Sequence, residues 1–545
     1  MTCSARWSSF PQTLLPRRTS NLRGWGRSSL NNRSSDKKYG RRAAVLTVVS
    51  LAAKVVGALY RIPLTNIIGA EGVGLYQLIF GIYALALALT SAFSATLISR
   101  QVSSYLALGD ESGARGYFFA ATTESLLSSA LVGTALFLFG ERIASLQGAA
   151  GGGVGYRVIA PAVLLVAMLS ALKGWFNGNM DLLPSAVSIM VEQGVKLLFG
   201  ISLAYLFRDR GAYVACAAAL GGVTASELVA TVTIGGVYFS KRKRAPKVKV
   251  PYRRVLKEGL ALRLNGLILP LSVFVDGLII VRLLGRYGLT EGEGVAAYGI
   301  YSGAVNSIVN FPVVLVLSLA VAVIPLIARS KTTRDIDTIK GKASLTLKLT
   351  LVISLPSAFA LLILAPKVIG LIYPVFTAEE KATAVALLTV GAGSVIFLSL
   401  TQIYSSLLQA IDRADVAAES LAIAISVRLM LVLLLVPRLG ILGIALATLL
   451  SYALATLLCL LKWWQYTGRS ENAVKTLALT TASGGIMILA ILAPVLLVKS
   501  ALWSILLSAV IGTTVYFVAV LRFKIFSRGE LESMPLSSLT TKIGG

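Results

Sequence analysis

The amino-acid sequence predicts an all-α polytopic membrane protein with about 14 transmembrane helices, since a helix of roughly 20 apolar residues crosses the hydrocarbon core of a bilayer. Of its 545 residues, 56% are hydrophobic and only 14% are charged, and the mean hydropathy is +0.80. These values exclude an ordinary soluble domain. Between residues 43 and 521, long apolar stretches alternate with short polar connections, as successive membrane spans do.

Charge and residue usage exclude several classes of partner. The net charge is +27, but the basic residues lie mainly in the N-terminal stretch and in short connections, which favours contact with anionic lipids over nucleic acid. The cysteines stand singly (Cys3, Cys216 and Cys459), which argues against a disulfide framework or a zinc site. The chain has no histidine, the commonest metal ligand. We therefore expect membrane lipids as partners, with no metal and no nucleic acid.

The first half of the chain begins with a stretch of different composition. Residues 1–42 are rich in Arg, Lys, Ser and Asn and lack the apolar segment of a signal peptide. We expect a disordered basic tail there, with a transit peptide or a start codon placed too far upstream as alternatives. Residues 43–240 form a first lobe, whose expected spans are 43–68, 72–99, 117–140, 158–176, 183–207 and 211–240.

A basic linker separates the first lobe from the second half. Residues 241–259 contain nine Lys or Arg between positions 241 and 257 and no acid in that interval. Residues 260–465 form the second lobe, with expected spans at 260–284, 295–328, 343–364, 383–409, 418–437 and 442–463. Residues 466–525 carry a final pair of spans, 476–497 and 502–521, and residues 526–545 form a tail.

Basic residues predict the orientation of these spans. They gather in the N-terminal tail, in the 241–259 linker, after the eighth span and at the C-terminus, all on one side of the expected topology. By the positive-inside rule this side is cytoplasmic, so both termini are expected to face the cytoplasm. We expect the protein to lie in the inner, cytoplasmic membrane of the cell. The opposite connections are too short to hold an enzyme domain, and we expect no enzymatic activity.

The two lobes have related segments. Gly72-Val-Gly-Leu-Tyr76 begins the second span as Gly294-Val-Ala-Ala-Tyr298 begins the eighth, and Val195-Lys196-Leu197 recurs as Val427-Arg428-Leu429. Repeated six-helix lobes with both ends on one side predict a pseudo-two-fold axis along the membrane normal and a central cavity between the lobes. Chance similarity between helices rich in Gly and Ala is the alternative.

The first span keeps two cations inside apolar sequence. Lys54 and Arg61 are seven residues apart, which returns them to nearly one helix face about 10 Å apart along the axis. Gly57 lies on the same face and leaves room for an anionic headgroup. A charge inside hydrocarbon marks a functional site by default. The alternatives are that Arg61 snorkels outward or that both cations pair with acids on other helices, namely Glu124, Glu227 or Asp276.

Other polar residues within spans are assigned by their spacing. Asp276 has no basic residue three or four positions away, so it is a candidate for coupling to H⁺ or a monovalent cation, with a salt bridge to another helix as the alternative. Glu192 and Lys196 have the spacing of an intrahelical ion pair. A polar stripe at spacing four is expected either to contact substrate in the cavity or to join helices, and it consists of Ser302, Asn306 and Asn310.

Two segments of the first hairpin carry a family resemblance. Residues 54–65 read KVVGALYRIPLT and residues 68–76 read IGAEGVGLY. They resemble the stage V sporulation protein B-like branch of the multidrug/oligosaccharidyl-lipid/polysaccharide flippase superfamily, which also contains lipid II flippases. The likeness continues at residues 174–178, 408–413 and 440–448 and covers most of the chain from 43 to 521.

This resemblance implies a two-lobed transporter that moves undecaprenyl-pyrophosphate-linked saccharides across the cytoplasmic membrane by alternating access, with no cofactor. It implies that Lys54 and Arg61 match the basic positions required in the first helix of lipid II flippases. Ile62 stands where those flippases place an acid, and no arginine in the second or eighth span matches their other cavity cations. A peptidoglycan precursor and a different surface-polysaccharide intermediate both stay open as the substrate.

The sequence lacks a nucleotide-binding motif, and this absence bears on the source of energy for transport. No segment fits GxxxxGK[ST], so no nucleotide is expected, and an ion gradient or the membrane potential would drive transport. A drug/cation antiporter of the same superfamily is the alternative function, although it would place acids, rather than cations, in the first lobe. A membrane enzyme or scaffold in polysaccharide assembly is a further alternative.

Overall fold

A computed structural model of the chain describes residues 32–241, 252–317, 336–468 and 473–527, together with residues 248, 250, 327 and 530. Every regular element in these ranges is a helix. Thirteen helical segments of the described chain are long and apolar enough to cross a membrane, and the first of them, Ala44–Ala107, holds both spans of the predicted first hairpin. The predicted all-α polytopic fold is confirmed. Residues 1–31 of the predicted tail 1–42, residues 242–247, 249 and 251 of the predicted linker 241–259, and all but three residues of the predicted tail 526–545 lie outside the described residues.

The first helix, α1 (Asn32–Thr90), bends at a glycine. Gly69 has φ 72° and ψ −179°, a combination open to glycine because it has no Cβ. This bend falls between the predicted spans 43–68 and 72–99. The helix begins at Asn32, inside the stretch expected to be a disordered tail, and ends at Thr90 rather than at residue 99, where a short turn leads into α2 (Ser94–Ala107).

The remaining helices of the first half pack around α1 as one bundle. Its largest contacts join α5 to α6, α3 to α4, and α4 to α6. Asp110 starts α3 by accepting a hydrogen bond from the Gly113 amide at 2.7 Å, which satisfies a free N–H of the first turn. The bounds are α3 (Glu111–Leu146), α4 (Gly153–Gly178), α5 (Leu183–Phe207), the 3₁₀ turn η1 (Arg208–Arg210) and α6 (Ala212–Lys241).

The predicted linker ends in a helix that belongs to the first bundle. The expected span 260–284 is divided at Leu267 into α7 (Tyr252–Gly266) and α8 (Ile268–Tyr287). Glu258 on α7 accepts hydrogen bonds from the Tyr117 hydroxyl at 2.7 Å and the Gln101 amide at 3.0 Å. These bonds hold α7 against α2 and α3.

The second half forms a second bundle with a helix pair on its outer side. Capping boxes at Thr290 and Thr377 fix the starts of α9 and α12, because each threonine and the glutamate three residues later satisfy one another's backbone amides. The helices α15 and α16 pack on each other and on α11. The bounds are α9 (Glu291–Gly299), the π-helical η2 (Ile300–Val305), α11 (Ile336–Ile372), α12 (Ala378–Ala410), α13 (Ala414–Leu439), α14 (Ile441–Thr467), α15 (Ala473–Leu497) and α16 (Ala501–Arg522).

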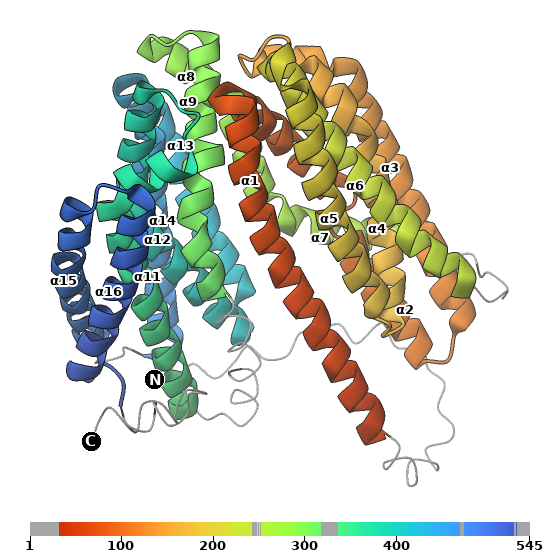
Figure 1. Cartoon of the computed structure of the whole chain (residues 1–545). Coiled ribbons are helices and arrows are strands. Elements are labelled where there is room, and N and C mark those ends of the chain that lie inside the picture. The colour runs from red at the N-terminus through yellow and green to blue at the C-terminus, as the bar shows by residue number, and fades with distance from the viewer. Residues whose placement is uncertain are drawn as a thin grey trace.

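The two bundles meet along α1, which stands between them in Figure 1 and packs against α8, α9 and η2 of the second bundle. A Cβ on Gly299 would collide with the Ala70 carbonyl oxygen and the Gly74 backbone, so glycine permits this close approach. Figure 1 shows the bundles close together near the bend of α1 and spread apart toward the end where α1 begins.

Candidate functional site

A cavity of about 410 Å³ lies between the two bundles and is lined by both. The first bundle contributes part of α1, including Arg61, Gln77 and Phe80. The second bundle contributes α8, the helix that runs from α9 through η2 to Leu317, and parts of α12, α13 and α14. Because the cavity is bounded by two separate bundles, a relative movement of the bundles would change its access.

Arg61 brings a positive charge to this cavity from α1. Its guanidinium lies within electrostatic range of three tyrosines, Tyr76, Tyr298 and Tyr373. Within the described part of the chain, no carboxylate forms an ion pair with Arg61. The sequence leaves three arrangements open for Arg61: a place in the cavity, an outward snorkel, or a pair with an acid. In the structure Arg61 lies on the cavity wall, and no acid of the described chain pairs with it.

Gly57 and Lys54 are the other two residues of the first span that were predicted to contact substrate. Gly57 faces α5, since a Cβ on Gly57 would lie 3.7 Å from the Gln193 side-chain oxygen, and Gly57 does not line the cavity. The backbone of Lys54 lies in α1, two turns before Arg61. The side chain of Lys54 lies outside the described residues, so its predicted contact with substrate stays a prediction.

The predicted polar stripe lines the cavity. Ser302, Asn306 and Asn310 all belong to the cavity wall. The Ser302 hydroxyl donates to the Tyr298 carbonyl at 2.7 Å, and the Asn310 amide donates to the Asn306 carbonyl at 2.7 Å, both within one helix. The Ser302 carbonyl also accepts a hydrogen bond from the Gln77 amide of α1 at 3.4 Å, which joins the stripe to the first bundle. The π-helical turn η2 lies in the same wall, a feature frequent at functional sites.

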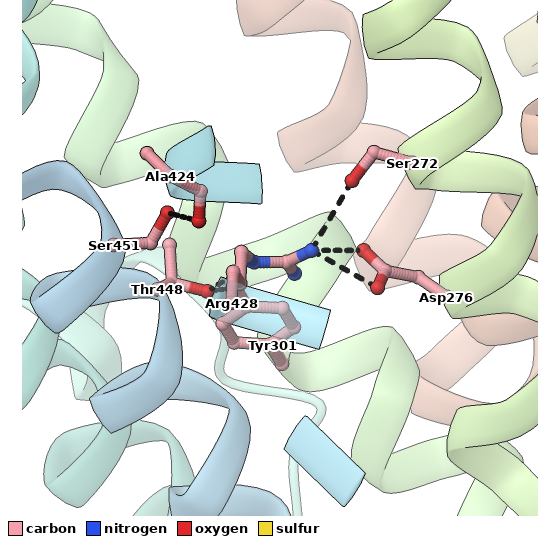
Figure 2. Close-up of polar contacts among 7 residues, drawn as sticks. All are labelled: Ser272, Asp276, Tyr301, Ala424, Arg428, Thr448 and Ser451. Carbon is pink, nitrogen blue, oxygen red and sulfur yellow. Dashed lines mark hydrogen bonds and ion pairs between the residues drawn. The ribbon is translucent and has the colours of Figure 1, made fainter. Parts of the chain in front are cut away.

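Asp276 is paired, contrary to its isolation in the sequence. Figure 2 shows the Arg428 guanidinium from α13 reaching Asp276 on α8, with Nη1 2.7 Å from Oδ2 and 3.0 Å from Oδ1. Arg428 Nε also donates to Thr448 at 3.1 Å, and Thr448 shares a hydrogen bond with Tyr301. Asp276 is thus salt-bridged to another helix, and a coupling role for it stays a prediction.

Arg428 was not predicted as a site residue. Its partner is 152 positions away, too far for any spacing argument. Two features of the sequence could have indicated it: an arginine inside an apolar helix, and the alignment of Arg428 with Lys196 in the predicted repeat.

A second group of charges lies in the first bundle beside the cavity. Glu192 pairs with Lys173 on α4 at 3.2 Å, and not with Lys196 as its spacing predicts. The Lys196 ammonium lies over the rings of Tyr60 and Phe80, at 5.5 and 5.8 Å from their centroids. Ring faces attract cations, and this attraction explains why Lys196 turns toward α1. Phe80 lines the cavity, so Lys196 lies one side chain behind its wall.

Comparison with known proteins identifies what this architecture resembles. A family model described as polysaccharide biosynthesis protein matches residues 39–331, more than half of the chain, and a model described as MatE matches residues 270–434. YabM, an uncharacterized membrane protein of Bacillus subtilis, is 27% identical over 92% of this chain and 95% of its own length. Lipid II flippase MurJ of the same organism is 24% identical over 93% of this chain and 94% of its own.

Two further matches bear on the predicted branch and fold. Stage V sporulation protein B of Bacillus subtilis is 24% identical over 76% of this chain and 81% of its own. A solved structure of lipid II flippase MurJ in an inward closed conformation has a TM-score of 0.69 at 15% identity, covering 88% of this chain and 99% of that one. The resemblance seen in the first hairpin is confirmed, and the solved structure shares the fold.

Proposed function

Because this chain belongs to the polysaccharide biosynthesis protein family, we propose that it is a flippase that moves a lipid-linked saccharide across the cytoplasmic membrane. The carrier we propose is a prenyl pyrophosphate of the undecaprenyl type, and the route is the cavity between the bundles. The observation that carries the proposal is Arg61, a cation on the wall of this cavity with no acidic partner in the described part of the chain. The names of the relatives lipid II flippase MurJ and stage V sporulation protein B support it.

The chemistry of the cavity fits the two parts of such a headgroup. A guanidinium binds phosphate oxygens through paired, charge-assisted hydrogen bonds. At a separation of about 4 Å and an effective dielectric of about 20, each close charge pair contributes about 4 kcal/mol of attraction before desolvation. Lys54, two turns earlier on α1, is proposed as a second cation. Asn306 and Asn310 offer amide groups to saccharide hydroxyls, and the volume of about 410 Å³ lies in the range of ligand pockets.

The transport cycle we propose is alternating access. The cavity would load from the cytoplasmic side and release on the other as the bundles rock, while the prenyl chain stays in lipid between helices. The basic connections support a cytoplasmic location for the side toward which the bundles spread. Under this proposal one moving lobe is residues 43–240 together with α7, and the other is the part of the predicted lobe 260–465 that follows α7. The helices α15 and α16 are accessory, and the protein transports without catalysing a covalent step.

A drug/cation antiporter is the second candidate, because the MatE model matches residues 270–434. Cavity charge separates the two functions. A cationic drug needs a free acid, and Asp276 is already neutralised by Arg428 at 2.7 Å, whereas Arg61 would repel such a ligand.

A reconstituted flipping assay tests the proposal. Purified protein in vesicles is given fluorescent or isotopically marked lipid-linked saccharides, and appearance of the saccharide in the opposite leaflet is measured. We expect the parent protein to flip these lipids. The flipping rate of Arg61→Ala should be lower by about tenfold or more, since 1.4 kcal/mol of lost attraction is a factor of ten. Arg61→Lys should keep part of the activity. Arg286→Ala, which removes an exposed arginine at the end of α8, is the matched control and should flip at the parental rate.

Two results would count against the proposed function. One is an Arg61→Ala protein that inserts normally and flips as fast as the parent. The other is a parent protein that moves cationic dyes in exchange for an ion but moves no lipid-linked saccharide.

A further inference from the structure

The first bundle encloses a carboxylate that has no role in the proposed transport cycle. Glu227, near the middle of α6, is only 8% exposed. Among the residues the structure describes, its Oε2 has no hydrogen-bond partner, and no ion pair within 4 Å joins it to a lysine or arginine. An ionised carboxylate held in this way is costly, because no group of the described chain replaces the water that Oε2 leaves.

Charged and titratable groups lie near Glu227 on each of the three α-helices packed against α6, namely α1, α4 and α5. Lys173 comes from α4, and Glu192 and Lys196 come from α5. From α1, the Tyr83 hydroxyl has Glu227 and Glu192 as electrostatic neighbours, is buried, and likewise finds no hydrogen-bond partner in the described chain. The site therefore has two acids, two lysines and a phenol, with Glu192 already paired to Lys173 at 3.2 Å.

We infer that Glu227 is a proton-binding site whose occupancy controls how strongly the neighbouring cavity attracts an anion. A proton is the cation that this site can take. A metal ion would need several oxygen ligands and would be repelled by the two lysines, and the described residues contain no group of three or more acidic, histidine or cysteine side chains that could hold one.

The route from Glu227 to the cavity passes through Lys196. The ammonium of Lys196 lies over the ring of Phe80 on the cavity wall and within electrostatic range of Arg61. An ionised Glu227 offsets the charge of Lys196, whereas a protonated Glu227 leaves this charge to act together with Arg61. Anion binding and proton binding are then reciprocal, so each raises the affinity for the other. The pyrophosphate part of this linkage rests on the proposed function, whereas proton binding by Glu227 does not.

Infrared difference spectroscopy on the purified full-length protein tests the proton site directly. The parent, stepped through a pH series, should show the carbonyl stretch of a neutral carboxylic acid that disappears as the pH rises. Glu227→Gln should remove this band. Glu124→Gln, the same change at another buried acid of the bundle, should keep it. If Glu227→Gln does not fold, Glu227→Asp keeps the carboxyl and should move the band. A band that is absent from the parent, or unchanged in the Glu227 variants, overturns the inference.

Calorimetric titration with inorganic pyrophosphate tests the linkage. Because Glu227→Gln imitates the protonated state, it should bind pyrophosphate on the order of tenfold more tightly than the parent at high pH, and the two affinities should converge at low pH. Comparing the two proteins at each pH cancels the titration of pyrophosphate itself. Equal affinities at every pH, or no binding by either protein, would overturn the linkage. A parent with the infrared band that flips no lipid-linked saccharide would contradict the proposed function and support the proton site.

Discussion

At the scale of single residues, the two arginines of the cavity differ in the partners that they already have. Arg428 is held by Asp276 and Thr448, whereas no acid of the described chain pairs with Arg61. A ligand can therefore bind Arg61 without displacing a protein partner. Arg428 instead joins α13 to α8 and shapes the wall. Lys196, which the predicted repeat aligns with Arg428, lies over two aromatic rings of α1 and within electrostatic range of Glu192, Glu227 and Arg61.

The Asp276–Arg428 pair predicts a non-additive effect on stability. Asp276→Asn leaves a buried guanidinium without its counter-ion and should lower the free energy of unfolding by about 3–5 kcal/mol, as should Arg428→Met. The double variant removes both charges, so its loss of unfolding free energy should be much smaller than the sum of the losses in the two single variants. Unfolding of the four proteins in detergent measures this coupling. Losses that simply add would contradict a direct ion pair.

The same variants test the coupling role predicted for Asp276. If Asp276 carries H⁺ or a monovalent cation, the folded double variant should flip lipid-linked saccharide without responding to an ion gradient. Flipping rates with and without the gradient provide the measurement. A response to the gradient equal to that of the parent would reduce Asp276 to a structural partner of Arg428.

Part of the site could be predicted from single residues and part could not. Charges and amides inside apolar spans identified Arg61, Asp276, Asn306 and Asn310, all of which line the cavity. A helical wheel shows which residues share a face, but not where along the helix a neighbour covers that face. This is why Gly57 meets Gln193 on α5 although Arg61, one turn later, reaches the cavity.

At the scale of elements, the bend of α1 decides how the first bundle meets the second. Gly69 at φ 72° interrupts the helix just before Ala70 and Gly74, whose backbones touch Gly299 of the second bundle. Hydropathy located this boundary because polar and small residues cluster there. It did not locate the turn after Thr90 or the break between α7 and α8, because no charged residue stands at either of these two positions. The docking of α7 depends on Glu258 hydrogen bonds across 141 and 157 positions.

Gly69→Ala should destabilise the protein through its backbone alone. No atom lies within 4 Å of a Cβ at this position, so the effect is the strain of placing alanine in a glycine-only region, about 1–3 kcal/mol. Gly236→Ala on α6 is the matched control, since it also meets open space but has ordinary helical geometry, and it should be neutral or stabilising by about 0.5–1 kcal/mol. Thermal unfolding of both variants checks this, and equal effects would count against strain at Gly69.

At the scale of the whole molecule, the distribution of basic residues predicts which end of the bundles faces the cytoplasm. A cysteine at Arg210, exposed in the 3₁₀ turn between α5 and α6, should react with an impermeant thiol reagent added to intact cells. A cysteine at Lys257 on α7 should react only after the membrane is opened, because this position belongs to the basic linker 241–259. The native cysteines are replaced first. The reverse labelling pattern would invert the proposed direction of loading.

Alternating access requires the bundles to separate where they now touch, and a reversible crosslink can prevent this. A Cβ on Gly303 would lie 2.8 Å from a Val73 methyl carbon, which places the two Cβ positions near the 3.5–4.5 Å that a disulfide needs. In a protein without its native cysteines, Val73→Cys with Gly303→Cys should form a disulfide between α1 and η2. Oxidation should then stop flipping in reconstituted vesicles, and a reductant should restore it. Each single cysteine variant should be insensitive to oxidation. A crosslinked protein that still flips at its reduced rate would mean that the substrate moves without separation of the bundles at this end, and rocking of two lobes would have to be replaced by a local opening.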